Sequence, residues 1–396
     1  MIDRDTALEH LNTIGRLEGI ETVSIMAALN RVLASDVIAR HTQPPASMSA
    51  MDGYAVRGEG LKPGNSYSVI GESAAGHPFS GTVGGAEAVR IFTGSVVPEG
   101  ADHVVIQEDV RRDSDAITIC EGVGKSTHIR QAGIDFKEGQ VLLKSGVQLQ
   151  PRHLSIIAAS NNPSVDVIRR PRVAILSNGD ELRPPGSQLR SGEIIASNEY
   201  TLAALISAWG GEPINLGIAP DDPSRIRNMI ADAEGVNVFL PVGGASVGDH
   251  DHMKPVFADL GFESVFSKVA IKPGKPTWFS KQGQVSVLGL PGNPASALVC
   301  AHLFLRPLLS SYLGLDDTRQ WCAARLTRPL SANGRRENFL RGRLRYQPDG
   351  TIEVDPAVNQ DSSLLSPFID ADVLVQRRAD APAAEAGSMV DCMRLN

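Results

Sequence analysis

Cysteine is scarce in this chain of 396 residues. The four cysteines, Cys120, Cys300, Cys322 and Cys392, lie far apart, and none belongs to a Cys-x-x-Cys pair. This spacing argues against a disulfide scaffold and against a zinc site. It fits a protein of the reducing cytoplasm, where thiols stay free.

Long hydrophobic runs and an excess of positive charge are also missing. The strongly apolar segment Ala295 to Leu305 is too short to span a bilayer. The charged start Met1 to Asp5 has no apolar core behind it, which argues against a secretory signal. The formal net charge of −7 excludes nonspecific nucleic-acid binding as a function. We therefore expect neither a membrane nor a nucleic acid as partner.

The chain has the composition of a folded protein, with 42% hydrophobic and 21% charged residues. Its length suggests about two to four domains. Residues 3–40 show apolar residues at helical spacing, with Thr6 as a candidate cap, and Pro44 and Pro45 then interrupt any helix. Residues 54–147 carry short β-like runs separated by glycine and proline, which indicates a small, mostly β domain.

Residues 171–315 alternate between strand and helix. Buried-type strands are predicted around residues 173–176, 214–218, 236–242 and 285–288, with helices between and after them. This pattern predicts a three-layer α/β domain whose sheet is mostly parallel and covered on both faces. Polar loops at 177–181, 219–222, 243–251 and 289–296 follow the strands, so they should meet at one edge of the sheet.

The domain division that follows has four parts. Residues 1–50 and 148–170 form an N-terminal helical and extended domain, and 51–147 form the inserted β domain. Residues 171–320 form the α/β domain. A β domain at 321–396 ends the chain, and seven arginines fall between Arg325 and Arg345.

The loop after residue 242 is the most informative stretch. Three glycines, a serine and two aspartates follow an apolar strand in Gly243-Gly244-Ala245-Ser246-Val247-Gly248-Asp249-His250-Asp251. Small residues let the backbone approach a ligand closely, and exposed N–H groups in such loops bind anions. Asp249 and Asp251 are candidate ligands for a hard cation such as Mg²⁺. A tight turn with solvated acids explains the same residues.

Other charged residues could bind a ligand or could have a purely structural role at the surface. Asp180 and Glu181 are candidate Mg²⁺ ligands or surface acids. Asp222 is placed to cap a helix that begins at Pro223, which leaves Asp221 as the freer carboxylate. If residues 269–271 form a strand, Lys268 and Lys272 project from one face as a clamp for an oxyanion or phosphate. Lysines on a solvated edge strand are the alternative.

These segments, taken in order, resemble one family. They are Met51-Asp52-Gly53-Tyr54-Ala55-Val56, Arg90-Ile91-Phe92-Thr93-Gly94, Gly133-Ile134-Asp135, Gly179-Asp180-Glu181-Leu182, Ser197-Asn198, the 243–248 loop, Lys272-Pro273-Gly274-Lys275-Pro276 and Leu290-Pro291-Gly292-Asn293-Pro294. Nearly the whole chain is similar to the molybdopterin molybdenumtransferases, or MoeA proteins, which include the E domain of gephyrin. The resemblance implies an enzyme that inserts molybdenum from molybdate into adenylylated molybdopterin, with Mg²⁺-dependent release of AMP, as an elongated homodimer.

The resemblance also implies roles for individual residues. The catalytic positions would be Asp52, Thr93, Asp135, Glu181, Asp221, Asp251, Lys268 and Lys272. Mg²⁺ ligands would come from Glu181, Asp221 and Asp251. Pterin and molybdate would be bound by Gly243, Gly244, Ser246, Gly248, Pro273, Lys275, Ser296, Arg341 and Ser363, with Ser362 as the alternative to Ser363.

The chain also departs from the family's usual pattern. Ser47-Met48 stands where an Asp-Asn pair is usual, and Asn178 stands where a small hydroxyl or glycine is usual. Two other functions remain open: molybdopterin adenylylation, and a gephyrin-like non-enzymatic scaffold. Partners under the main hypothesis are a molybdopterin adenylyltransferase upstream and molybdoenzyme acceptors downstream.

Overall fold

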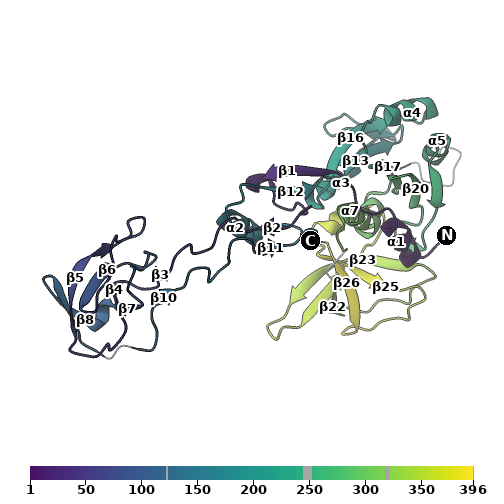
Figure 1. Ribbon diagram of the computed structural model, residues 1–396. Helices are drawn as coiled ribbons and strands as arrows, with labels where there is room; N and C mark the ends of the chain where they lie inside the picture. Colours follow the sequence, from purple (N-terminus) through teal and green to yellow (C-terminus); the bar gives the residue numbers. More distant parts are fainter. Residues whose placement is uncertain (122–123, 244–251, 317–320, 396) are drawn as a thin grey trace. The chain divides into compact units, whose positions relative to one another are not determined.

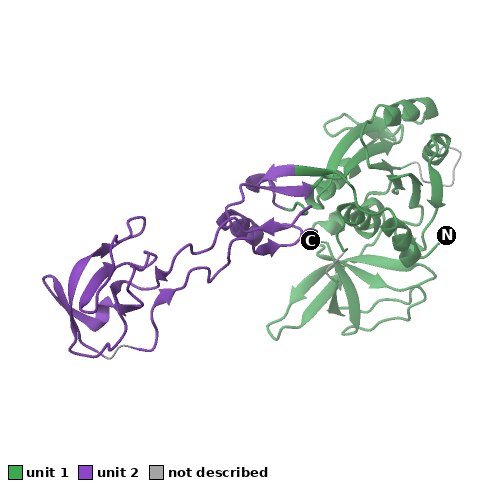
Figure 2. Ribbon diagram, in the orientation of Figure 1, with its two compact units in different colours: residues 1–21, 30–32, 168–396 green, residues 22–29, 33–167 purple. Residues whose placement is uncertain are grey.

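The computed structural model describes residues 1–121, 124–243, 252–316 and 321–395, which form two compact units. Unit 1 comprises residues 1–21, 30–32 and 168–396, and unit 2 comprises residues 22–29 and 33–167 (Figure 2). Each unit has its own sheets and its own hydrophobic core.

A six-stranded sheet forms the centre of unit 1, in the order β16-β13-β17-β21-β20-β18 (Figure 1). The first four of these strands run parallel, β20 runs antiparallel to β21, and the edge strand β18 runs antiparallel to β20. The bounds are β13 Arg172–Asn178, β16 Glu212–Ala219, β17 Val238–Val242, β18 Glu263–Phe266, β20 Trp278–Gln282 and β21 Val285–Gly289. The predicted mostly parallel α/β sheet is therefore confirmed.

Alternation along β13 explains the three layers. Val173 and Ile175 point into one core, while Ala174 and Leu176 point into another on the opposite face of the sheet. The first core is shared with α1, α3 and the helices after residue 293, and the second with α4 and α5. The helix bounds are α1 Arg4–Asn12, α3 Asn198–Ala208, α4 Pro223–Ala231 and α5 Met253–Asp259.

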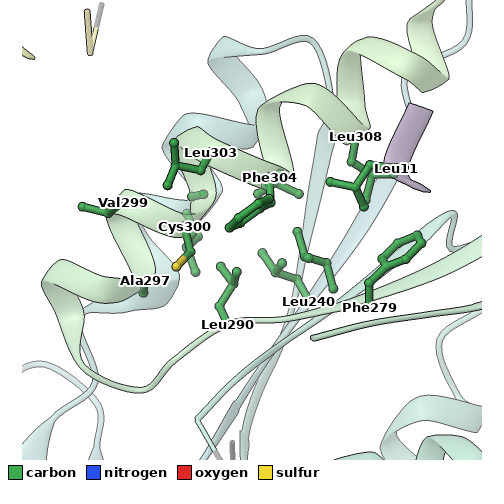
Figure 3. Close-up of a cluster of buried hydrophobic side chains, with 14 of the residues drawn as sticks. Leu11, Leu240, Phe279, Leu290, Ala297, Val299, Cys300, Leu303, Phe304 and Leu308 are labelled. Atoms are coloured by element: carbon green, nitrogen blue, oxygen red, sulfur yellow. The ribbon is translucent and has the colours of Figure 1, made fainter. Parts of the chain in front are cut away.

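The apolar segment near residue 300 is longer than the sequence suggested. α6 Pro294–Cys300, the π-helical turn Ala301–Leu305 and α7 Arg306–Leu313 form one continuous helix. Its 20 residues are long and apolar enough to cross a membrane, so the expectation that the segment is too short is wrong. However, 83% of its most apolar window is buried inside the fold. Figure 3 shows Phe304 lying between this helix and the side chains of Leu240 and Leu290.

A closed ring of five strands completes unit 1. β23 pairs with β24, β24 with β22, β22 with β26, β26 with β25, and β25 with β23 again. Closure removes the exposed sheet edges. The bounds are β22 Trp321–Leu326, β23 Glu337–Tyr346, β24 Ile352–Pro356, β25 Val373–Arg377 and β26 Met389–Arg394. The two-residue strand β19 Ile271–Lys272 adds to β23.

Unit 2 contains a second six-stranded sheet, in the order β7-β4-β6-β5-β9-β8. Its strands are β4 Gly53–Val56, β5 Ser66–Ser73, β6 Glu87–Ile91, β7 His103–Ile106, β8 Val110–Asp113 and β9 Ala116–Ile119. Tyr54, Val56, Tyr67 and Ile117 fill its core, so the predicted mostly β character is confirmed. Helix α2 Pro151–Ala159 and the ladders β2 Val37–Ile38 with β11 Val141–Leu143 and β3 Met48–Ser49 with β10 Ile129–Arg130 complete the unit.

The helical prediction for residues 3–40 is largely wrong. Helix α1 ends at Asn12, and Gly15 then takes a left-handed φ of 77°. The chain continues as β1 Ile20–Ser24, which pairs with β12 Ser164–Ile168. Asp3 rather than Thr6 caps α1, because its carboxylate accepts a hydrogen bond from the Thr6 N–H.

Candidate active site

A pocket of about 800 Å³ opens within unit 1, where the carboxyl ends of β13 and β17 meet the loop after β21. Its lining residues are Ser177, Asn178, Glu181, Leu182, Ile194, Ile195, Ala196, Ser197, Asn198, Val242, Gly243, Lys268, Lys275, Pro276, Pro291, Gly292, Asn293, Pro294 and Ser363. This is the edge at which ligands of parallel sheets bind. Ligand pockets commonly have volumes of roughly 300–1,000 Å³.

Glu181 reaches the pocket because a glycine precedes it. Gly179 has a φ of 151°, and a Cβ built on it would lie only 2.6 Å from a carboxylate oxygen of Glu181. A larger residue at 179 would push this carboxylate aside. Among the described residues, no donor bonds to the Glu181 carboxylate, so both oxygens are available to a ligand.

Asn178 holds the neighbouring acidic loop. Its side chain is buried, and its Nδ2 donates to Asp221 Oδ1 at 2.8 Å and to the Ala219 carbonyl at 3.3 Å. The Asp221 N–H donates in turn to Asp180 Oδ1 at 3.2 Å. The loops at 177–181 and 219–222 therefore meet, as predicted. Asp221 itself does not line the pocket.

Gly243 connects β17 to the loop that follows β21. Its N–H donates to the Leu290 carbonyl at 3.1 Å, and its φ is 96°. A Cβ at this position would lie 2.6 Å from the Asn178 carbonyl oxygen, so only glycine fits. Four of the predicted site residues, Gly244, Ser246, Gly248 and Asp251, lie outside the described residues.

The basic groups of the pocket differ from the predicted pair. Lys268 and Lys275 line the pocket, whereas Lys272 lies on β19 opposite Asn338 of β23. The strand is Ile271–Lys272 rather than 269–271, so the predicted spacing placed the wrong lysine beside Lys268. Pro273, the neighbour of Lys272, does not line the pocket either.

Ser363 rather than Ser362 faces the pocket. The Ser363 hydroxyl donates to Asp361 Oδ1 at 2.6 Å, and this bond together with the Ser363 N–H lowers the pKa of the Asp361 carboxyl. Ser362 is used to fix the loop, because its Oγ accepts from Asn293 Nδ2 at 3.0 Å and its carbonyl accepts from the Ala295 N–H at 3.0 Å. Ser296 is buried in α6 and does not line the pocket.

Arg341 is buried behind this loop, with 2% of its surface exposed. Its guanidinium donates to the carbonyl oxygens of Leu364 at 2.8 Å and Asp361 at 3.0 Å, and to Gln360 Oε1 at 3.1 Å. It also lies over the Phe368 ring, 5.4 Å from the centroid. Arg341 thus holds the loop that presents Ser363, and it does not line the pocket.

The sequence analysis did not predict the apolar wall of the pocket or the polar side chain of Asn198. Leu182, Ile194, Ile195 and Ala196 form an apolar wall, which is built on the pairing of β14 Leu182–Arg183 with β15 Ile194–Ile195. Asn198 donates from Nδ2 to the Gly292 carbonyl at 2.8 Å, while its Oδ1 is buried without a partner among the described residues. The Ser197-Asn198 pair before a helix was the available signal.

Asp52 and Thr93 are brought together in unit 2, as neighbours on the ends of β4 and β6. Asp52 Oδ1 accepts from the Thr93 N–H at 2.7 Å and from its hydroxyl at 2.8 Å. These two bonds, the backbone one first, lower the pKa of the Asp52 carboxyl, and Arg90 adds a smaller electrostatic contribution. Asp135 is an exposed residue of the same unit.

Three family models match the chain in sequence. The MoeA N-terminal region (domain I and II) matches residues 2–160, a probable molybdopterin binding domain matches 174–311, and the MoeA C-terminal region (domain IV) matches 323–395. A curated relative from Haemophilus influenzae, named molybdopterin molybdenumtransferase, is 37% identical over 375 residues, which is 92% of each chain. The chain belongs to the MoeA family.

Further comparisons agree with this assignment. A Nostoc protein of the same name is 36% identical over 91% of this chain and 86% of its own length. A solved structure of a molybdopterin biosynthesis MoeA protein from Pyrococcus horikosii superposes with a TM-score of 0.85 at 31% identity, covering 100% of this chain and 99% of its own. Among the described residues of this MoeA chain, Ser363 is the one pocket residue from the C-terminal region.

Proposed function

We propose that this MoeA-family chain is a molybdopterin molybdenumtransferase that inserts molybdenum during molybdenum cofactor biosynthesis. The observation that carries this conclusion is the pocket, because all of its described lining residues except Ser363 fall within the probable molybdopterin binding domain. The pocket combines an apolar wall, two lysines and an unbonded carboxylate. Those groups suit a flat ring system, an oxyanion and a reacting centre, respectively.

The substrates of this proposal are adenylylated molybdopterin and molybdate. Lys268 and Lys275 supply positive charge for phosphate or molybdate oxygens. The unpaired Oδ1 of Asn198 can accept a hydrogen bond from a ring N–H, so ligand binding would satisfy a buried acceptor. The Ser363 hydroxyl donates to Asp361 and would rotate to donate to an oxyanion instead.

Mg²⁺ is the proposed cofactor, and the donor set fits it in part. Glu181 and Asp221 are the described members of the predicted ligand set, and oxygen ligands are what Mg²⁺ prefers. Among the described residues, no three His, Cys, Asp or Glu side chains gather to hold a metal. Mg²⁺ sites commonly use one or two carboxylates plus substrate phosphate oxygens, which suits this arrangement. When bound, the ion would neutralise charge that develops on the phosphate.

The remaining catalytic assignments concern described residues that do not line the pocket, together with Asp251, which lies outside the described residues. Asp52 and Thr93 form one hydrogen-bonded pair, and we propose with them Asp135, Lys272 and Asp251 as catalytic positions. The pKa of Asp52 is lowered, so its carboxyl is ionised at neutral pH and suits a phosphate-bound cation.

The proposal extends to assembly and cellular setting. We propose a homodimer in the cytoplasm that receives its pterin from a molybdopterin adenylyltransferase and passes the cofactor to molybdoenzymes. The four-part division at residues 50, 147, 170 and 320 belongs to the same proposal. Support comes from the matched regions, whose descriptions name domains I and II at 2–160 and domain IV at 323–395.

The test compares Glu181→Gln with the wild-type chain, using adenylylated molybdopterin, molybdate and Mg²⁺. We expect the rate of AMP release to fall by about 10²-fold or more, since the variant removes a charge aimed at the reacting centre. Asp259→Asn is the matched control, because Asp259 is exposed, lies on α5 and does not line the pocket. Wild-type turnover by a folded Glu181→Gln chain would remove Glu181 from the reaction. A chain that only adenylylates molybdopterin from ATP, or has no turnover, would support the alternative functions.

A further inference from the structure

Two of the four cysteines face each other across neighbouring strands of the C-terminal ring. Cys322 of β22 and Cys392 of β26 are direct partners in an antiparallel pair. Residues directly opposite in such a pair point to the same face of the sheet. Here that face is the interior, because Cys392 belongs to the buried cluster of the ring and Cys322 packs against it.

The register meets the distance requirement for a disulfide. Directly opposed residues of antiparallel strands have Cα atoms about 4.5–5.5 Å apart. Disulfides form between Cα atoms roughly 4.4–6.8 Å apart. The register therefore places the Cα atoms of Cys322 and Cys392 within the range that a disulfide spans. The other two cysteines lack such a partner: Cys120 is exposed in unit 2, and Cys300 is fully buried in α6 beside Gly274.

The two thiols differ in their surroundings. Cys322 is partly exposed and lies close enough to the Arg394 guanidinium to interact with it electrostatically. Arg394 also donates to the Tyr346 hydroxyl at 3.1 Å and lines a cavity of about 360 Å³ with Arg343, Leu344 and Asp372. A neighbouring arginine stabilises a thiolate. Cys392 is buried, and burial first, then Cys322 and Asp391, raise the pKa of its thiol to about 12.

We propose that Cys322 and Cys392 are a reversible dithiol–disulfide pair that links β22 to β26 when a small-molecule disulfide is present. The Cys322 thiolate attacks the small disulfide, breaks its S–S bond and releases one small thiolate. The Cys392 thiol gives its proton to solvent and attacks the Cys322 sulfur, which forms the protein disulfide and expels the second small thiolate. Two protein thiols are oxidised, and one small disulfide is reduced to two thiols.

The experiment uses the full chain carrying Cys120→Ala, which removes the exposed thiol without touching unit 1. This chain is incubated with oxidised glutathione, alkylated, digested and mapped by mass spectrometry without reduction. We expect a peptide that joins Cys322 to Cys392, with Cys300 alone alkylated after denaturation, and full reversal by dithiothreitol. Cys392→Ala should instead stop at a glutathione adduct on Cys322.

Arg394→Gln tests the positioning of the reactive thiol. This variant should form the same disulfide several-fold more slowly than the Cys120→Ala chain. The proposal is overturned if the Cys120→Ala chain stays fully reduced, if only glutathione adducts accumulate, or if a joined peptide contains Cys300. An unchanged rate in Arg394→Gln would remove the arginine from the account.

Discussion

His302 shows how one buried side chain makes stability depend on pH. It lies in the π-helical turn, and its ring meets Trp209 edge-on with centroids 5.1 Å apart. Its Nδ1 is buried without a partner among the described residues. Burial first, and Arg306 second, lower the pKa of His302 to about 4. The folded state therefore holds the imidazole neutral.

The predicted consequence is a loss of stability in acid. The unfolded chain binds a proton at His302 as pH falls below about 6.5, whereas the folded chain resists until about pH 4. The free energy of unfolding should fall through this window by an amount on the order of 3 kcal/mol relative to His302→Phe. Denaturant unfolding of both chains at pH 7, 5.5 and 4 measures this difference. If the free energies of unfolding of the wild-type and His302→Phe chains differed by the same amount at all three pH values, the folded chain would bind a proton at His302 as readily as the unfolded chain does.

At the scale of the element, the start of helix α4 gives the two adjacent aspartates Asp221 and Asp222 different roles. Asp222 caps the helix, with its carboxylate accepting from the Ser224 N–H at 2.8 Å and the Arg225 N–H at 3.2 Å. Asp222→Ala should lower the free energy of unfolding by about 1 kcal/mol and leave turnover unchanged. Asp221→Ala should lower turnover, since Asp221 belongs to the proposed Mg²⁺ set. Unfolding and AMP-release assays on both variants test the contrast, and equal loss of turnover in the two would contradict it.

The loop at 359–364 depends on a single arginine from β23. Arg341→Met removes the hydrogen-bond donors to the carbonyls of Asp361 and Leu364, so two part-buried hydrogen bonds of the loop would be lost. We expect a loss of about 2 kcal/mol or more in the free energy of unfolding, with faster proteolysis of the loop. A side chain that only bound molybdate would cost no stability on removal. Unchanged unfolding together with lost turnover would restore Arg341 to direct ligand binding.

The sequence allowed the strands and helices of the α/β region to be predicted, because their periods of two and 3.6 are set by local packing. Gly179 and Gly243 indicated where the pocket loops lie. Each takes a positive φ, and at each a Cβ would collide with a carboxylate or backbone oxygen. The helix over 3–40 failed because an apolar stripe continues past Gly15, where the backbone turns. Lys272 and Arg341 were placed wrongly relative to the pocket, because the pairing of β19 with β23 and the burial of a guanidinium depend on distant segments.

At the scale of the whole molecule, the two units divide the proposed catalytic residues. Unit 1 holds the pocket with Glu181, Lys268 and Lys275, and unit 2 holds Asp52, Thr93 and Asp135. The proposed homodimer predicts that light scattering gives about twice the chain mass of 42.2 kDa. A monomeric mass at the concentrations used for turnover would contradict the dimer without affecting the pocket.

The central claim is that this chain transfers molybdenum to the pterin as the adenylate is released. The direct measurement is a single-turnover reaction of the wild-type chain with adenylylated molybdopterin, Mg²⁺ and molybdate, in which AMP and molybdenum-loaded pterin are quantified together. We predict equal amounts of the two products and loss of loaded pterin when molybdate is omitted. AMP release without any molybdenum in the pterin, or consumption of ATP to form the adenylate, would contradict the account.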